Sequence, residues 1–184
     1  MNDKPGSPRA GFTLVEISVV VLILALMLTT ATVRLDSYLP SSRAESAARN
    51  LLSTIDLART TAISKGVVYE VEMDLDGKRY RILTPYDRDG NLVRNREERR
   101  GLNWVELPSG VFFGTILTLS GGVVQSGTYY LPFDQIGSAE EVYIQIENEA
   151  GEGFALTAIV QALTGASSVK QGREEPSLVT EQDF

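Results

Sequence analysis

One carboxylate stands inside a long apolar stretch near the start of the chain. From Phe12 to Val33, Glu16 is the only charged side chain. An acidic residue at the centre of a membrane helix costs about 2.5–3.5 kcal/mol, and it usually persists because it has a partner. Cleavage after Gly11 would supply one, because the new α-amino group of Phe12 would lie one helical turn from Glu16. The spacing therefore indicates an ion pair within one chain or between neighbouring chains.

The apolar stretch has the length of a membrane span. At 1.5 Å per residue, a helix over residues 12–33 is roughly 30 Å long, which matches the hydrocarbon core of a bilayer. A secretory signal peptide would have a shorter apolar region and a small-x-small cleavage site, which Thr29-Thr30-Ala31 matches poorly. A plain membrane anchor would leave Glu16 unexplained. Lys4 and Arg9 precede the span, and this places the N-terminus in the cytoplasm by the positive-inside rule.

The residues around the expected cut read Gly11-Phe12-Thr13-Leu14-Val15-Glu16. They resemble the processing motif of the type IV pilins and of the pseudopilins of type II secretion at every position. This resemblance implies cleavage after Gly11 by a membrane prepilin peptidase, which also acts as the N-methyltransferase, and methylation of Phe12. It further implies that Glu16 pairs with the N-terminus of a neighbouring subunit during fibre assembly.

A second, amphipathic helix is expected over residues 34–66, with a kink or a break at Pro40. Ser42 and Glu45 have the spacing of a capping box at a helix start. Apolar residues then recur in steps of three and four, which predicts one buried stripe. The stripe comprises Ala44, Ala47, Ala48, Leu51, Leu52, Ile55, Ala58 and Ala62. Gly66 is the expected helix terminator.

Residues 67–171 have the pattern of a β-rich head. Alternation from Val67, followed by Asp76-Gly77, predicts a first hairpin, and residues 142–147 and 154–160 predict a second one. We expect seven or eight antiparallel strands and thus an α+β fold, which the resemblance makes pilin-like: a long N-terminal helix, first transmembrane and then amphipathic, packed on an antiparallel sheet. Residues 1–11 are the expected leader, and residues 172–184 an expected disordered tail.

Charged residues crowd the first half of this head. Glu70 and Glu72 are placed to pair across the first hairpin with Lys78, Arg79 or Arg81. Residues 94–100 form an arginine-rich run that fits either an interaction loop or a solvated charged surface. Residues 87–91, from Asp87 through Asp89, resemble half a calcium loop, but Arg88 intrudes and an exposed turn is the alternative. Ion binding there is left open by the sequence.

The composition excludes several functions. The chain has 184 residues, no cysteine and no histidine, so thiol chemistry, zinc–thiolate sites and the usual general base are absent. No glycine-rich phosphate loop opens a helix, and acidic pairs such as Glu140-Glu141 fit exposed turns. We therefore expect no enzyme activity, no catalytic residues, no cofactor and no metal. A net charge of -7 argues against nucleic acid as a partner.

The C-terminal half carries a second resemblance. Residues 130–137, which include Pro132 and Gly137, and the later Thr164-Gly165 resemble motifs of the H-type minor pseudopilins and the FimT-like pilins, although this chain spaces them more widely. The resemblance implies a tip-associated minor pseudopilin of type II secretion, anchored once in the bacterial inner membrane with its head in the periplasm. Its partners would be the bilayer, other major and minor pseudopilins and the inner-membrane assembly platform. A minor type IV pilin for pilus assembly, adhesion, motility or DNA uptake is the alternative.

Overall fold

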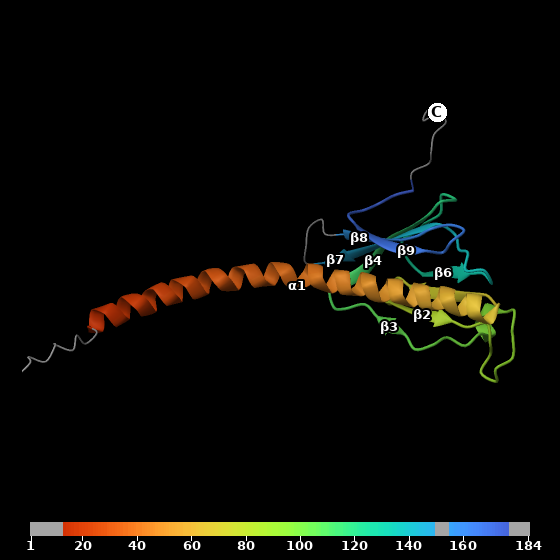
Figure 1. Cartoon of the computed structure of the whole chain (residues 1–184), viewed down its shortest axis with the longest axis horizontal. Coiled ribbons are helices and arrows are strands. Elements are labelled where there is room, and N and C mark those ends of the chain that lie inside the picture. Colours follow the sequence, from red (N-terminus) through yellow and green to blue (C-terminus); the bar gives the residue numbers. More distant parts are fainter. Residues whose placement is uncertain (1–12, 150–154, 177–184) are drawn as a thin grey trace, which may run out of the picture. The chain divides into compact units, whose positions relative to one another are not determined.

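The chain consists of one long helix and nine strands within the residues described. The structure is a computed structural model that describes residues 13–149 and 155–176, with the backbone alone for residues 28–40. Helix α1 covers Leu14–Lys65 (Figure 1). Two compact units divide the chain, one up to Tyr38 and the other from Leu39 onward.

A break at Pro40 is contradicted, because the backbone is helical on both sides of this residue and at it, whereas the alternative of a kink stays a prediction. A proline inside a helix removes one backbone hydrogen bond and adds a ring that crowds the preceding turn. The turns that follow are held by burial: Ala44, Ala47 and Ala48 are at most 1% exposed. That packing fixes the helix beyond the proline, so a new helix start at Ser42 is not needed.

The predicted apolar stripe on α1 is confirmed. All of its members are buried except Leu52, which is partly buried against the same core. Alanine dominates the stripe, and its small side chain lets the helix backbone approach a sheet closely. Gly66 ends the helix with φ +64°, and the N–H groups of Gly66 and Val67 both donate to the carbonyl of Ala62. This is the left-handed glycine terminus that the sequence indicates.

The head contains two antiparallel sheets where the sequence predicted one. The four-stranded sheet has the order β3-β2-β1-β6, and the five-stranded sheet has the order β5-β4-β7-β8-β9. Their strands are β1 (Tyr69–Asp74), β2 (Arg79–Leu83), β3 (Val105–Glu106), β4 (Val111–Thr118), β5 (Val123–Val124), β6 (Thr128–Phe133), β7 (Val142–Asn148), β8 (Ala155–Val160) and β9 (Ser167–Gln171). Both predicted hairpins are confirmed, as β1–β2 and β7–β8.

A single hydrophobic core joins α1 to the inner faces of both sheets. Tyr80 of β2 is 1% exposed, and its ring meets that of Phe113 of β4 edge-on, with 6.3 Å between the centroids. Edge-to-face contacts of this kind are a favourable aromatic geometry. The contact ties the two sheets together beneath the helix. Burial raises the pKa of Tyr80, so its hydroxyl stays neutral.

The chain beyond β9 is bound to the five-stranded sheet for at least three residues. The N–H of Gly172 donates to the carbonyl of Ala155, and the N–H of Glu174 donates to Oγ1 of Thr157. Arg173 makes two 3.0 Å contacts with the carboxylate of Glu147. These residues are ordered by the sheet, although the expected tail begins at 172. The rest of that tail, residues 177–184, lies outside the described residues.

The sequence predicts a leader and a membrane span in the first unit. In the part of the chain that the structure describes, no helix is both long enough and apolar enough to cross a membrane. Residues 1–12, and the side chains of residues 28–33, lie outside the described residues. The leader over residues 1–11 and the span over residues 12–33 therefore stay predictions.

Candidate functional site

The N-terminal motif opens helix α1. Thr13 precedes the first helical residue, and its Oγ1 accepts a hydrogen bond of 3.2 Å from the N–H of Glu16. The carbonyl of Thr13 accepts from the N–H of Ile17 at 3.3 Å. Thr13 is thus the N-cap, and Glu16 is the third residue of the helix. Gly11 and Phe12, the expected cleavage and methylation residues, lie outside the described residues.

Glu16 is exposed in the first turn, where a helix favours negative charge because its N–H groups point toward this end. The surrounding side chains are apolar and exposed as well: Leu14 is 84% exposed and Val15 70%. A threonine cap with a glutamate three residues later is the pattern of a capping box. The spacing of Thr13 and Glu16 carries this capping signal in the sequence, in addition to the processing motif predicted there.

The glycines of the second resemblance meet in the folded head. Gly165 has φ +60°, and a Cβ atom there would overlap the carbonyl oxygen of Gly137, which itself has φ +81°. Nε of Arg59 on α1 donates to the carbonyl of Thr164 at 2.7 Å. The turn before β7 and the turn before β9 are therefore packed together against the helix. This gives Gly137, Thr164 and Gly165 a structural role.

An ionic layer covers the outer face of the four-stranded sheet. Glu70 of β1, whose side chain is 6% exposed, pairs with Arg96 at 2.7 Å and with Arg99 at 2.9 Å. Glu72 pairs with Arg81 at 2.6 Å. The predicted pairing of Glu72 with Arg81 is confirmed, whereas Glu70 takes its partners from the loop between β2 and β3. The same carboxylate raises the pKa of Arg96, mainly through its hydrogen bond.

Aromatic rings flank this layer. The guanidinium of Arg81 lies 4.1 Å from the ring centroid of Trp104, and that of Arg79 lies 4.4 Å from it. Arg96 lies 4.1 Å from the ring of Tyr130. Attraction between a cation and a ring face fixes each guanidinium plane. The arginine-rich run over residues 94–100 therefore folds over the sheet at Arg96 and Arg99, contrary to a fully solvated charged surface.

The loop over residues 87–91 is a tight turn around one carboxylate. Oδ1 of Asp87 accepts from the N–H groups of Asp89 and Asn91, at 2.9 Å and 2.8 Å. These hydrogen bonds, chiefly those from Asn91, hold the pKa of Asp87 below its usual range. In residues 13–149 and 155–176, no group of three or more acidic side chains could hold a metal ion. Oδ1 of Asp87 therefore accepts hydrogen bonds from the backbone of its own turn.

Comparisons with known proteins agree with these features. Residues 6–32 match the family described as the prokaryotic N-terminal methylation motif. The family match covers this N-terminal motif alone, and the fold of the chain resembles that of a minor pseudopilin and a minor pilin of known structure.

Solved structures define the fold more closely. The minor pseudopilin EpsH from the type 2 secretion system of Vibrio cholerae is 18% identical with a TM-score of 0.51, over 70% of this chain and 97% of that one. The type IV minor pilin FimU of Pseudomonas aeruginosa is 16% identical with the same TM-score of 0.51, over 73% and 93%. The α+β, pilin-like fold is thus confirmed. No curated protein matches this sequence.

Proposed function

We propose that this protein is a minor pseudopilin, a structural subunit near the tip of the type II secretion pseudopilus that helps to export folded proteins. The observation that carries the proposal is the N-terminal motif, in which a capped helix presents Glu16 in its first turn, directly after the expected cut. A head with the fold of EpsH supports the same assignment. EpsH itself is described as a minor pseudopilin of type 2 secretion.

The proposed arrangement follows the layout of the sequence. A leader over residues 1–11 is removed, residues 12–33 cross the inner membrane once with the N-terminus cytoplasmic, and the head stands in the periplasm. Glu16 then pairs with the methylated N-terminus of a neighbouring subunit as the fibre grows. The opposite charges of the pair remove the cost of holding a lone carboxylate in lipid. Further partners are the assembly platform and the major and minor pseudopilins.

Processing is tested on the protein purified from membranes of its native host. Mass spectrometry should find a mature chain that begins with N-methylated Phe12. Gly11→Ala should slow cleavage, because the peptidase motif requires the glycine, and should leave a precursor larger by residues 1–11. A mature chain that begins elsewhere, or unchanged cleavage of the variant, would contradict the proposal.

Assembly is tested by replacing Glu16. Glu16→Ala should leave membrane insertion intact, since an apolar side chain is cheaper in lipid, yet it should prevent incorporation into fibres. Ser18→Ala is the matched control, because Ser18 is also exposed and lies in the next turn, where its hydroxyl donates only to the carbonyl of Leu14. Sheared fibres probed by immunoblot give the measurement. Normal incorporation of Glu16→Ala would overturn the proposed role.

A minor type IV pilin is the second candidate, because the fold is as close to FimU as to EpsH. A DNA-uptake role would favour a basic face, whereas Lys170 and Arg173 pair with Glu174 and Glu147. The discriminating experiment is co-purification from the host with minor subunits of each system. Recovery with pilus subunits alone, or tight and salt-sensitive DNA binding, would favour the second candidate.

A further inference from the structure

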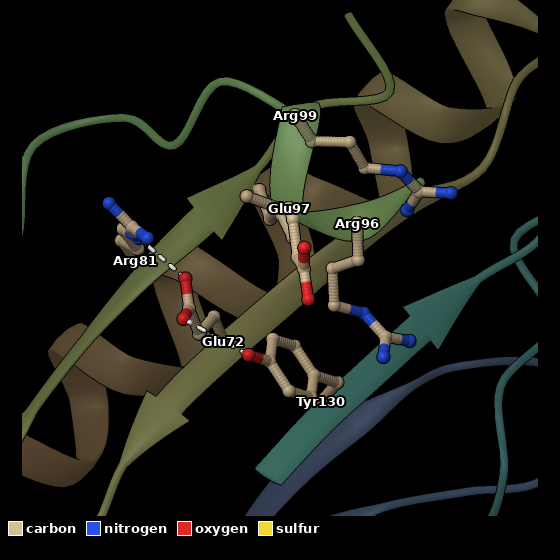
Figure 2. A pocket seen from close by; sticks show the side chains of 7 residues that line it. Glu72, Arg81, Arg96, Glu97, Arg99 and Tyr130 are labelled. Atoms are coloured by element: carbon tan, nitrogen blue, oxygen red, sulfur yellow. Dashed lines mark hydrogen bonds and ion pairs between the residues drawn. The ribbon is translucent and has the colours of Figure 1, made fainter. Parts of the chain in front are cut away.

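A pocket of about 290 Å³ opens on the outer side of the four-stranded sheet, under the short 3-10 helix η1 (Arg96–Glu98). Figure 2 shows that its wall comes from three segments: η1 and Arg99, the strands β1 and β2, and Tyr130 on β6. Three guanidinium groups line it, those of Arg81, Arg96 and Arg99. Three arginines therefore lie close together in a protein whose net charge is -7.

Carboxylates and aromatic rings hold two of these arginines, Arg96 and Arg81, in position. Arg96 contacts both oxygens of Glu70, at 2.7 Å through Nε and 3.3 Å through Nη2, and stacks on Tyr130. Arg81 donates Nε to Glu72 and stacks on Trp104. Buried carboxylates and rings thus hold the guanidinium planes before any ligand arrives. Binding then costs less side-chain entropy, because these long side chains are already ordered.

The hydrogen-bonding capacity of the three guanidiniums is not used up. Each guanidinium carries five N–H donors. Arg99 spends Nη1 on Glu70 at 2.9 Å and brings Nη2 to 3.4 Å from the carbonyl of Arg94. Nε of Arg99 is buried and has no hydrogen-bond partner among the described residues. Arg96 contacts Glu70 through Nε and Nη2, its Nη1 takes no part in these contacts, and its side chain stays half exposed, at 48%. Because Nε of Arg99 is buried, the donor that remains for an incoming acceptor is Nη1 of the half-exposed Arg96.

Glu97 is the acidic residue of η1 that lines the pocket. Figure 2 shows its carboxylate between the strand that carries Glu72 and the side chain of Arg96. Glu97 makes no ion pair within 4.0 Å to any described residue, whereas the adjacent Glu98 accepts a hydrogen bond from Asn95 at 2.8 Å. A carboxylate in the wall of the pocket without a cationic partner repels a second negative charge, so it limits how tightly the pocket binds an anion.

We propose that this arginine pocket binds a carboxylate, an aspartate or glutamate side chain presented by a neighbouring protein subunit. The planar fork of arginine matches a carboxylate with two parallel hydrogen bonds. A nucleic-acid strand is disfavoured, because Glu72 and Glu97 in the wall repel a row of phosphates more strongly than a single carboxylate. That the partner is another subunit rests on the proposed function, whereas the carboxylate chemistry rests on the pocket alone.

The first experiment measures binding by the full chain in detergent micelles. A fluorescein-labelled peptide of alternating glutamate and glycine is titrated in about 0.15 M salt, where long-range attraction is screened, and the glutamine version serves as its control. We expect the glutamate peptide to bind at least about tenfold more tightly, as for one charge-assisted pair. Arg99→Gln should weaken it about tenfold. Arg88→Gln, an equal charge change at an exposed site outside the pocket, should not weaken it.

A second pair of variants predicts the opposite sign. Glu97→Gln removes the carboxylate that lines the pocket and should tighten binding of the glutamate peptide about fivefold, because a like charge at contact distance is lost. Glu98→Gln makes the same charge change one residue away, outside the pocket, and should alter binding less than about twofold. If the ionic layer only stabilised the fold and bound no ligand, Glu97→Gln would not tighten binding of the peptide.

Folding is checked separately, because Arg99 also covers Glu70. If Arg99→Gln unfolds the head, Arg96→Lys serves as the test variant instead. Lysine keeps the positive charge but lacks the planar fork of N–H donors, so binding of the glutamate peptide should still fall about tenfold. Equal binding of both peptides, equal losses in Arg88→Gln and Arg99→Gln, or equal effects of Glu97→Gln and Glu98→Gln would each overturn the proposal. These outcomes leave the fibre role intact, since that role is tested at Phe12 and Glu16.

Discussion

The two described parts of helix α1 use their apolar side chains in opposite ways. Over residues 13–27, Leu22 is 61% exposed and Leu24 53% exposed, and every large hydrophobic side chain is open. Over residues 41–65, Leu51 and Ile55 are completely buried. Beyond Ser18 the first part is apolar around its whole circumference, whereas the second presents a stripe. The first therefore needs partners from outside the chain, and the second is already satisfied within the head.

The largest effect should come from the buried stripe. Leu51→Ala should lower the free energy of unfolding of the head by about 2–5 kcal/mol, because it leaves a cavity beside two sheets. Leu24→Ala, the same change in the exposed part, should stay within about 0.5 kcal/mol. Denaturation of the full chain in micelles, followed by fluorescence of Trp104, the single tryptophan, gives both values. Similar losses in the two variants would contradict the comparison.

A smaller loss is expected where the closing turn meets the helix. Gly165→Ala should cost roughly 3 kcal/mol, because it combines a left-handed backbone with an overlap at the carbonyl of Gly137. Gly66→Ala has nearly the same φ, +64°, but open space around its Cβ, and should cost only about 1 kcal/mol. The same denaturation measurement applies. Equal costs would mean that the contact of the two turns contributes nothing.

The ionic layer should contribute less to the stability of the head than the buried stripe or the contact between the two glycine turns. Glu70→Gln leaves the guanidiniums of Arg96 and Arg99 without their carboxylate, and the 48% exposure of Arg96 lets water compensate in part. We expect a loss of about 1–3 kcal/mol. Glu98→Gln removes an exposed carboxylate and should cost at most about 0.5 kcal/mol. A Glu70→Gln head as stable as the wild type would show that this pairing is neutral.

The smallest effect is a dependence on acid. The N–H of Gly77 donates to Asp74 and, with the Arg79 ion pair, lowers the pKa of that carboxyl group. Ionised Asp74 therefore stabilises the head above its unfolded pKa of about 4, and this stabilisation is lost as the pH falls through the lower folded value. Asp74→Asn should flatten the unfolding free energy between about pH 5 and pH 2. An unchanged slope would contradict this account.

The features that could be predicted from sequence are those with local signatures. The buried stripe, the end at Gly66 and both hairpins each depend on periodicity or on a turn residue, and all were predicted correctly. The N-terminal motif is also local, and residues 6–32 match a known family. Local patterns are sufficient here because each is determined by a few neighbouring side chains.

Other features depend on contacts between distant residues. The loop between β2 and β3 brings Arg96 over Glu70, which is 26 positions away, and a run of charges reads the same whether it is solvated or folded over a sheet. The division into two sheets also depends on pairing, since β1 binds β6 and β4 binds β7. Pro40 indicated a kink or a break, and burial of the following turns keeps the helix unbroken there.

The hydrogen bond between Arg59 and the carbonyl of Thr164 joins residues 105 positions apart. Closing a loop of this length costs more conformational entropy than closing a short one, and the contact cannot form before Thr164 has been synthesised. The head therefore completes its structure only when almost all of its sequence has left the ribosome. A shortened chain that ends before Thr164 would keep the four-stranded sheet, which is complete at Phe133, but would lose the clasp that holds the closing turn to the helix.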